Sequence, residues 1–239
     1  MRYDLLINGN DYTRVDTVKN PDASGSHVSF KPSGELRDYL NGNTTKIVLD
    51  DLITIIGNAF QNNKVITDVI LQNVTTAGEG VFNGCASLTT VDLPNLTRAT
   101  GNGFFFYCIK LKNVNLPKLE TVGQQLFGSC SSLEEISLSK LSVADINMCS
   151  GCESLKKVDL GVCSSIKGAA FYNCLALESI ILRSNTIVTI EDNSFGGNTS
   201  TTFRIYVPSS LVNEYKTNSK WSAFSERIFA IEGSEFEII

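Results

Sequence analysis

Residues 127–138 read FGSCSSLEEISL, and residues 171–182 read FYNCLALESIIL. Each stretch has a Phe, a Cys three positions later, and apolar residues three, six and eight positions after that Cys. The same unit recurs along the chain at steps of 23, 22, 22 and 22 residues, with its ladder position at Cys85, Cys108, Cys130, Cys152 and Cys174. A fixed period in the twenties predicts a solenoid, in which one short unit stacks on copies of itself.

The apolar positions of each unit predict one strand. Residues +6 and +8 from the ladder position are apolar and their neighbours are mostly polar, which is the period of two of a strand with one buried face. Strands that all run in the same direction form a parallel sheet, and at ~4.8 Å per strand seven of them span roughly 35 Å. The +3, +6 and +8 positions are Leu88, Val91, Leu93; Leu111, Val114, Leu116; Leu133, Ile136, Leu138; Leu155, Val158, Leu160; and Leu177, Ile180, Leu182.

The frame extends towards the N-terminus, where Asn63 and Asn41 take the ladder position. We therefore count seven units over residues 41–200. A Phe close to +19 closes most coils, and one extra residue within 101–106 allows either Phe104 or Phe105 to take that place. The fold class expected is a repeat solenoid, a right-handed superhelix with one parallel strand per coil of about 22 residues.

Residues 127–138 and 171–182 resemble the unit of the BspA-like class of leucine-rich repeats, which occurs in bacterial surface proteins. The resemblance covers about two thirds of the chain. It implies the leucine-rich-repeat fold and a role in adhesion or protein binding. It brings no catalytic residues with it.

The two ends differ from the repeats and are expected to cap them. Residues 1–40 contain a predicted hairpin over 3–15 with a turn at Asn8-Gly9, a loop over 20–26 and a helical turn over 35–40. This segment is a cap or a docking element. Residues 201–239 contain a predicted final strand over 203–207 and a short helix with Ser210 as its N-cap. Leu211, Val212 and Tyr215 form the apolar stripe of that helix, and Trp221, Phe224, Ile228 and Phe229 are expected to cover the last coil.

Composition argues against several functions. The 239-residue chain carries a net charge of −5, whereas a nucleic-acid-binding surface is basic. It has no apolar run near the ~20 residues that span a bilayer. The N-terminus lacks a secretory signal, so the chain stays inside, leaves by another route or is a trimmed form. His27, the only histidine, lies in a Gly-Ser loop, and no phosphate-binding glycine motif occurs. We expect no enzyme and no cofactor.

The seven cysteines all occupy positions of the repeat frame, where a reduced thiol serves as a small buried apolar group. Cys149 and Cys152 form a CxxC, a spacing that can indicate a redox pair or half of a zinc site. The repeat register alone also produces this spacing, because the +19 position always lies three residues before the next ladder position. We expect no metal site.

The strand residues between the buried ones should face outwards and could contact a partner. The +5 and +7 rows form a mixed polar face, with Val48 and Ile70 as a small apolar patch that the N-terminal segment should cover. The candidate partner-binding residues are Thr90, Asp92, Asn113, Asn115, Glu135, Ser137, Lys157 and Asp159.

Three functions remain. The leading hypothesis is a non-enzymatic module that binds a protein or matrix component outside the cell, with the surface location implied by the family resemblance. The rival is a structural component of a phage tail or envelope assembly, and the third is an intracellular scaffold. We expect a protein partner, no nucleic acid and no membrane insertion. The sequence leaves the oligomeric state open, with a monomer favoured.

Overall fold

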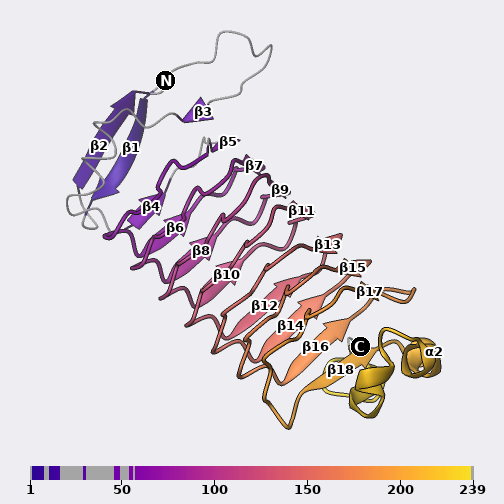
Figure 1. Ribbon diagram of the computed structural model, residues 1–239. Coiled ribbons are helices and arrows are strands. Elements are labelled where there is room, and N and C mark those ends of the chain that lie inside the picture. The colour runs from indigo at the N-terminus through magenta and orange to yellow at the C-terminus, as the bar shows by residue number, and fades with distance from the viewer. Residues whose placement is uncertain are drawn as a thin grey trace.

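The chain folds into a solenoid of stacked coils in the computed structural model (Figure 1). The structure describes residues 57–237 and, before them, residues 2–7, 11–16, 29–30, 46–48 and 54–55. Each coil gives one longer strand to the sheet on one side. These strands are β4 (Lys46–Val48), β6 (Asp68–Ile70), β8 (Thr90–Asp92), β10 (Asn113–Asn115), β12 (Glu135–Leu138), β14 (Lys157–Leu160), β16 (Ser179–Leu182) and β18 (Arg204–Val207). The predicted parallel-strand solenoid, with little helix, is confirmed.

The single sheet expected from the repeats is divided in two. Strands β4, β6, β8 and β10 pair in parallel as the N-terminal stack. Strands β12, β14, β16 and β18 pair in parallel as the C-terminal stack, to which β19 (Ile228–Ala230) adds an edge strand. No pairing joins β10 to β12 among the described residues, and most Cα–Cα distances between these two strands exceed 8 Å. We call this gap the opening.

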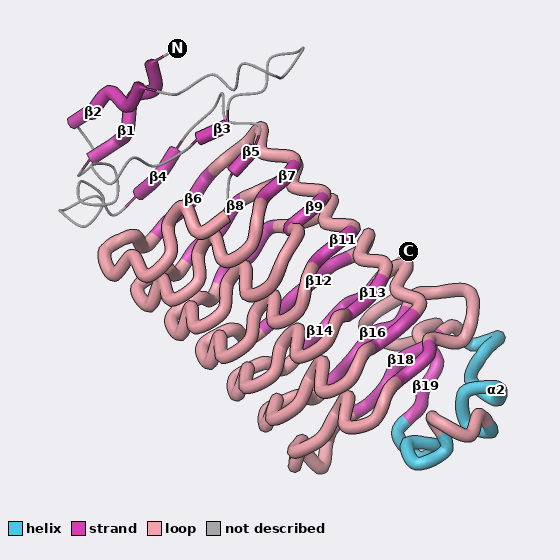
Figure 2. The backbone as a smooth tube through the Cα atoms, turned by 45° about the horizontal axis from the view of Figure 1, so that its top comes forward, coloured by secondary structure: helices cyan, strands magenta, loops and turns pink. Residues whose placement is uncertain are grey.

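A second row of two-residue strands, which the sequence did not predict, runs beside the longer ones. It also falls into two sheets, one of five strands and one of three. Loops and turns connect the two rows in every coil (Figure 2). The short strands are β3 (Ser29–Phe30), β5 (Thr54–Ile55), β7 (Thr76–Ala77), β9 (Arg98–Ala99), β11 (Thr121–Val122), β13 (Val143–Ala144), β15 (Ser165–Ile166) and β17 (Thr189–Ile190).

The core consists of ladders of like side chains. The leucines at +3 and +8 are buried in every described coil. Aromatic rings stack from coil to coil, with the Phe82 and Phe105 centroids 5.5 Å apart and those of Phe105 and Phe127 5.4 Å apart. Phe105 therefore takes the aromatic place that the sequence left open, and Phe104 packs edge-on against it. Cys149 interrupts this stack, which resumes at Phe171 with Phe195.

The cysteine ladder has a polar function beside its apolar one. Each ladder thiol donates to a carbonyl oxygen of the coil before it, as from Cys108 Sγ to Phe82 O at 3.0 Å and from Cys130 Sγ to Phe105 O at 3.1 Å. All seven cysteines are buried free thiols. Burial raises the pKa of the Cys130 thiol well above its usual value.

Two residues in each coil have a left-handed backbone, five and one positions before the ladder position. Gly and Asn adopt positive φ most readily, and they fill most of these places. Tyr107 and Ala169 hold one such place each, and among the described coils only the turn between β11 and β12 lacks Gly and Asn in both, with Gln125 (φ 59°) and Ser129 (φ 61°) there. This strained turn leads into the first strand beyond the opening.

The C-terminal segment closes the last coil. It contains 3-10 helices η1 (Ser209–Leu211) and η2 (Ser222–Arg227) around α2 (Val212–Thr217). Trp221 is fully buried and donates from Nε1 to Val188 O at 2.7 Å, while the hydroxyl of Tyr215 accepts from Val188 N at 2.9 Å. The side chains of Trp221 and Tyr215 thus form hydrogen bonds with the C=O and the N–H of Val188, a residue of the coil that they cover.

Other expectations for the ends have mixed outcomes. The strand predicted over 203–207 is confirmed as β18. Ser210 as N-cap was wrong, because it lies within η1 and α2 has Leu211 at its N-cap with no side-chain cap bond. The hairpin is confirmed in β1 (Arg2–Ile7) and β2 (Asp11–Asp16), which pair antiparallel. The turn at Asn8-Gly9, the loop over 20–26, His27 and the helical turn over 35–40 lie outside the described residues.

Candidate functional site

The eight candidate residues form two groups separated by the opening. In the N-terminal stack, Asn113 is in register with Thr90 and Asn115 with Asp92. In the C-terminal stack, Glu135 is in register with Lys157 and Ser137 with Asp159. Strand pairing therefore sets each group as a square of side chains on the sheet face.

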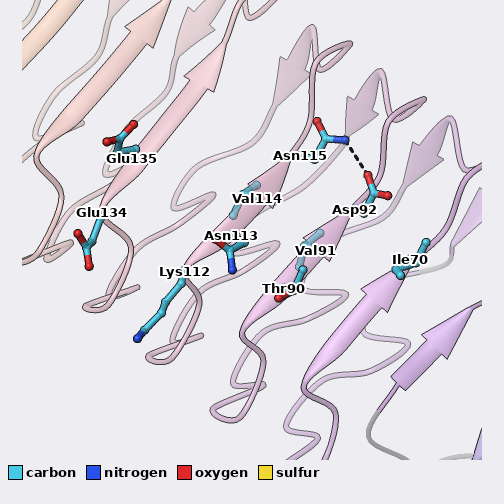
Figure 3. A pocket seen from close by; sticks show the side chains of 10 residues that line it. All are labelled: Ile70, Thr90, Val91, Asp92, Lys112, Asn113, Val114, Asn115, Glu134 and Glu135. Carbon is cyan, nitrogen blue, oxygen red and sulfur yellow. Dashed lines mark hydrogen bonds between the residues drawn. The ribbon is translucent and has the colours of Figure 1, made fainter. Parts of the chain in front are cut away.

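An open groove of about 730 Å³ lies on this face at the opening (Figure 3). Five of the eight candidates line it, and Ser137, Lys157 and Asp159 do not. The sequence analysis named Ile70 only as part of an apolar patch, and it did not include Val91, Lys112, Val114 or Glu134 among the candidate residues. The full lining is Ile70, Thr90, Val91, Asp92, Lys112, Asn113, Val114, Asn115, Glu134 and Glu135.

Amide side chains organise the N-terminal wall of the groove. The Asp92 carboxylate accepts from Asn115 Nδ2 at 2.7 Å and from Gln72 Nε2 at 2.9 Å. These three residues come from three successive coils. The carboxylate is thus held in place by neutral donors, and both Asn113 and Asn115 remain exposed.

Ion pairs organise the other wall. Lys156 binds Glu134 at 2.9 Å, and Lys157 binds Glu135 at 2.6 Å. The Lys156 ammonium, which donates to Glu134, lowers the pKa of that carboxyl. Among the four charged residues that line the groove, Lys112 alone has no ion pair or side-chain hydrogen bond within the described part of the chain.

The C-terminal tail covers the far end of the face. Arg183 forms a bidentate pair with Asp159, at 2.8 Å for the shorter Nη2–Oδ2 contact, and donates to Phe236 O at 3.0 Å. The Phe236 ring packs against Tyr206, with centroids 4.7 Å apart. The expectation that the +5 and +7 residues face outwards was wrong at Ser179 and Ile181, which are both buried in β16; Ser179 lies near Phe236 of the tail.

The expected apolar patch is only partly visible. Ile70 is half-buried and lines the groove, whereas the side chain of Val48 lies outside the described residues. Whether the N-terminal segment covers the patch stays a prediction.

Neither a metal centre nor a membrane span is found in the described residues. No group of three His, Cys, Asp or Glu side chains there is placed to hold a metal ion. Cys149 and Cys152 are both buried in the repeat frame. No described helix has the length and apolar character needed to cross a bilayer.

The sequence matches a family model described as "BspA type Leucine rich repeat region (6 copies)" over residues 39–150 and 145–227. The comparison with curated proteins gave no match.

Several solved structures are similar to this chain, and two of them are leucine-rich repeat proteins of bacteria. A leucine-rich repeat protein from Eubacterium ventriosum has 26% identity and a TM-score of 0.59 over 66% of this chain, which spans only 44% of that protein. The T. pallidum leucine-rich repeat protein TpLRR has 23% identity and a TM-score of 0.62 over 83% of this chain and 90% of that one. The second likeness supports the fold alone.

Proposed function

Since this chain belongs to the BspA-type leucine-rich repeat family, we propose that it is a non-enzymatic protein-binding module that recognises its partner through the sheet face. One observation carries the proposal. The groove at the opening brings together unpaired strand edges, amide side chains and the Lys112 ammonium, which forms no ion pair within the described chain. Such a surface suits recognition by hydrogen bonds, and sheet faces with exposed polar rows are common binding surfaces of solenoids.

The resemblance to bacterial surface proteins motivates a location outside the cell. Intact source cells would be treated with an external protease, with cytosolic proteins as the control. Selective loss of this protein is expected. Its protection would contradict the surface location, and the rival role in a phage tail or envelope assembly would then be tested in purified particles.

The role of the sheet face in binding is tested by changing the charges of its exposed side chains. We propose the variant Asn113→Lys, Asn115→Lys, Glu135→Lys and Lys157→Glu, assayed for binding to immobilised host-matrix proteins and to cells. A matched control, Lys140→Glu with Glu153→Lys, changes exposed charges that lie outside the longer strands.

The face variant should lose at least about 10-fold in affinity, because it removes several polar contacts worth about 1 kcal/mol each. Both variants should keep the wild-type circular dichroism and melting temperature. Equal affinity of the two variants would show that the partner binds elsewhere.

A further inference from the structure

At the opening, the edges of two parallel strands, β10 and β12, face each other, and no described strand pairs with either of these edges. Among the described strands, β10 pairs only with β8, and β12 pairs only with β14. Neighbouring strands in a sheet lie about 4.8 Å apart. Most Cα–Cα distances between β10 and β12 exceed 8 Å, so these two strands lie farther apart than the paired neighbours on either side of them.

Backbone groups of β10 point into this gap. Asn113 N donates to Thr89 O, and Asn115 O accepts from Leu93 N, so both residues turn their peptide groups towards β8. By the alternation of a strand, Val114 turns its N–H and C=O towards β12, which does not pair with it.

The backbone N–H of Leu116 also lacks a hydrogen bond to the next coil in the described chain. Its counterparts in the two preceding coils, Leu71 and Leu93, each donate from N to a carbonyl of the next coil, at 3.0 Å in both cases. Within the described residues, Leu116 N makes no such bond. Unpaired backbone groups at a sheet edge are the usual template for adding a strand.

The side chains around the gap define what would fit. Val114 points inwards yet is only half-buried, whereas Val91 and Ile136 at the same position of their coils are buried. Asn113 and Asn115 lie beside it on the outer face (Figure 3). Lys112 precedes Asn113, forms no ion pair or side-chain hydrogen bond in the described chain, and acts on the Glu134 carboxylate only through its charge.

We propose that the opening binds an extended peptide segment of a protein partner, which pairs with the free edge of β10. The segment has a small β-branched residue that packs inwards beside Val114, neutral polar residues on either side of it, and an acidic residue two positions before it that binds Lys112. This inference rests on the proposed function, and it identifies the chemistry of the partner.

The proposal is tested with the probe acetyl-Ser-Glu-Ser-Val-Ser-Thr-amide, titrated into the full chain and followed by amide shifts in NMR. Saturable binding, with changes concentrated in β10 and β12, is expected. The key pair of variants is Val114→Pro, which removes the N–H that faces the opening, and Val114→Ala, which keeps it.

Val114→Pro should weaken binding at least about 10-fold, and Val114→Ala at most about 3-fold. Equal losses, or unchanged binding by Val114→Pro, would overturn the pairing. Val91→Pro provides the folding comparison, because β8 is paired on both sides. If Val114→Pro lowers the melting temperature as much as Val91→Pro, the N–H of Val114 is bonded within a closed stack and the proposal fails.

A charge exchange gives a second readout that does not depend on the proline variant. Changing the Glu of the probe to Lys should weaken binding at least about 5-fold, and Lys112→Glu should reverse that preference. No saturable binding of the probe by the wild type, or no reversal, would overturn the inference. The proposed function would still stand if the face variant lost its partner in the earlier assay.

Discussion

The two stacks of the solenoid are built from the same apolar frame but hold their coils together differently. In the N-terminal stack the sheet face is joined by amides, with Gln72 and Asn115 both bound to Asp92. In the C-terminal stack it is joined by charges, as between Glu135 and Lys157. The C-terminal strands are also longer, at four residues against three. The difference teaches that the apolar repeat determines the coil, while the residues between its apolar positions determine which kind of polar contact joins neighbouring coils.

The largest expected effect on stability comes from truncating single core leucines at the opening and in the C-terminal stack. Leu116 borders the opening, Leu138 starts the C-terminal stack and Leu160 lies within it, and all three are buried. Each Leu→Ala change should cost about 2–5 kcal/mol in the free energy of unfolding. Leu116→Ala should fall at the low end, because unpaired strands can relax around the cavity. Urea denaturation measures the three values, and equal costs would argue that the opening gives no extra freedom.

The next test uses pH to measure how much Tyr215 of the C-terminal segment contributes to stability. Burial raises the pKa of Tyr215 to about 12 from its usual value of 10.0. The unfolded chain therefore loses this proton first as pH rises, so the stabilising contribution is complete below about pH 10 and is lost between about pH 10 and 12. Its full size is about 2–3 kcal/mol.

Tyr215→Phe should remove that dependence and cost about 1–3 kcal/mol at neutral pH, because Val188 N–H loses its acceptor. Melting temperatures of both proteins from pH 8 to 11.5 provide the measurement. A variant that keeps the wild-type pH profile would assign the alkaline loss to other groups.

The smallest effect concerns the strained turn beside the opening. Gln125→Gly should stabilise the fold by up to about 1 kcal/mol, because glycine adopts positive φ without a steric penalty. Asn147→Gly, at the same place one coil later, is the control and should change stability less, since Asn tolerates this backbone well. Thermal unfolding compares the two, and a larger gain at Asn147 would contradict the strain at Gln125.

The apolar frame made much of the fold predictable. A period of 22 residues with fixed apolar positions determines which side chains face inwards, and Leu88, Leu133 and Leu177 are buried as expected. The position of the candidate site was harder to predict from the sequence. Val114 and Ile136 satisfy the same pattern as every other pair, so nothing in the hydrophobic periodicity distinguishes bonded neighbours from separated ones. The available signal was the pair Gln125 and Ser129, because every other described coil has Gly or Asn in at least one of these two places.

The tail could not be predicted for a different reason. Phe236 lies in a short segment without periodicity, and its contact with Tyr206 joins residues that no repeat relates. Ile181 is buried in β16, between Asp159 of β14 and Tyr206 of β18. Patterns within one coil therefore predict its inner face, whereas contacts between a non-repeating segment and the array require the structure.

The opening also bears on how the molecule would respond to force. In a solenoid each coil contacts only its neighbours, so a pull on the two ends loads all the junctions in series. Within the described residues, the junction between β10 and β12 lacks the pairing of longer strands that the other junctions have, and it is held by turn hydrogen bonds such as Phe105 N to Leu126 O at 2.8 Å and by the ring stack of Phe105 on Phe127. Under tension the molecule would extend first at this point, with the coils on either side still folded.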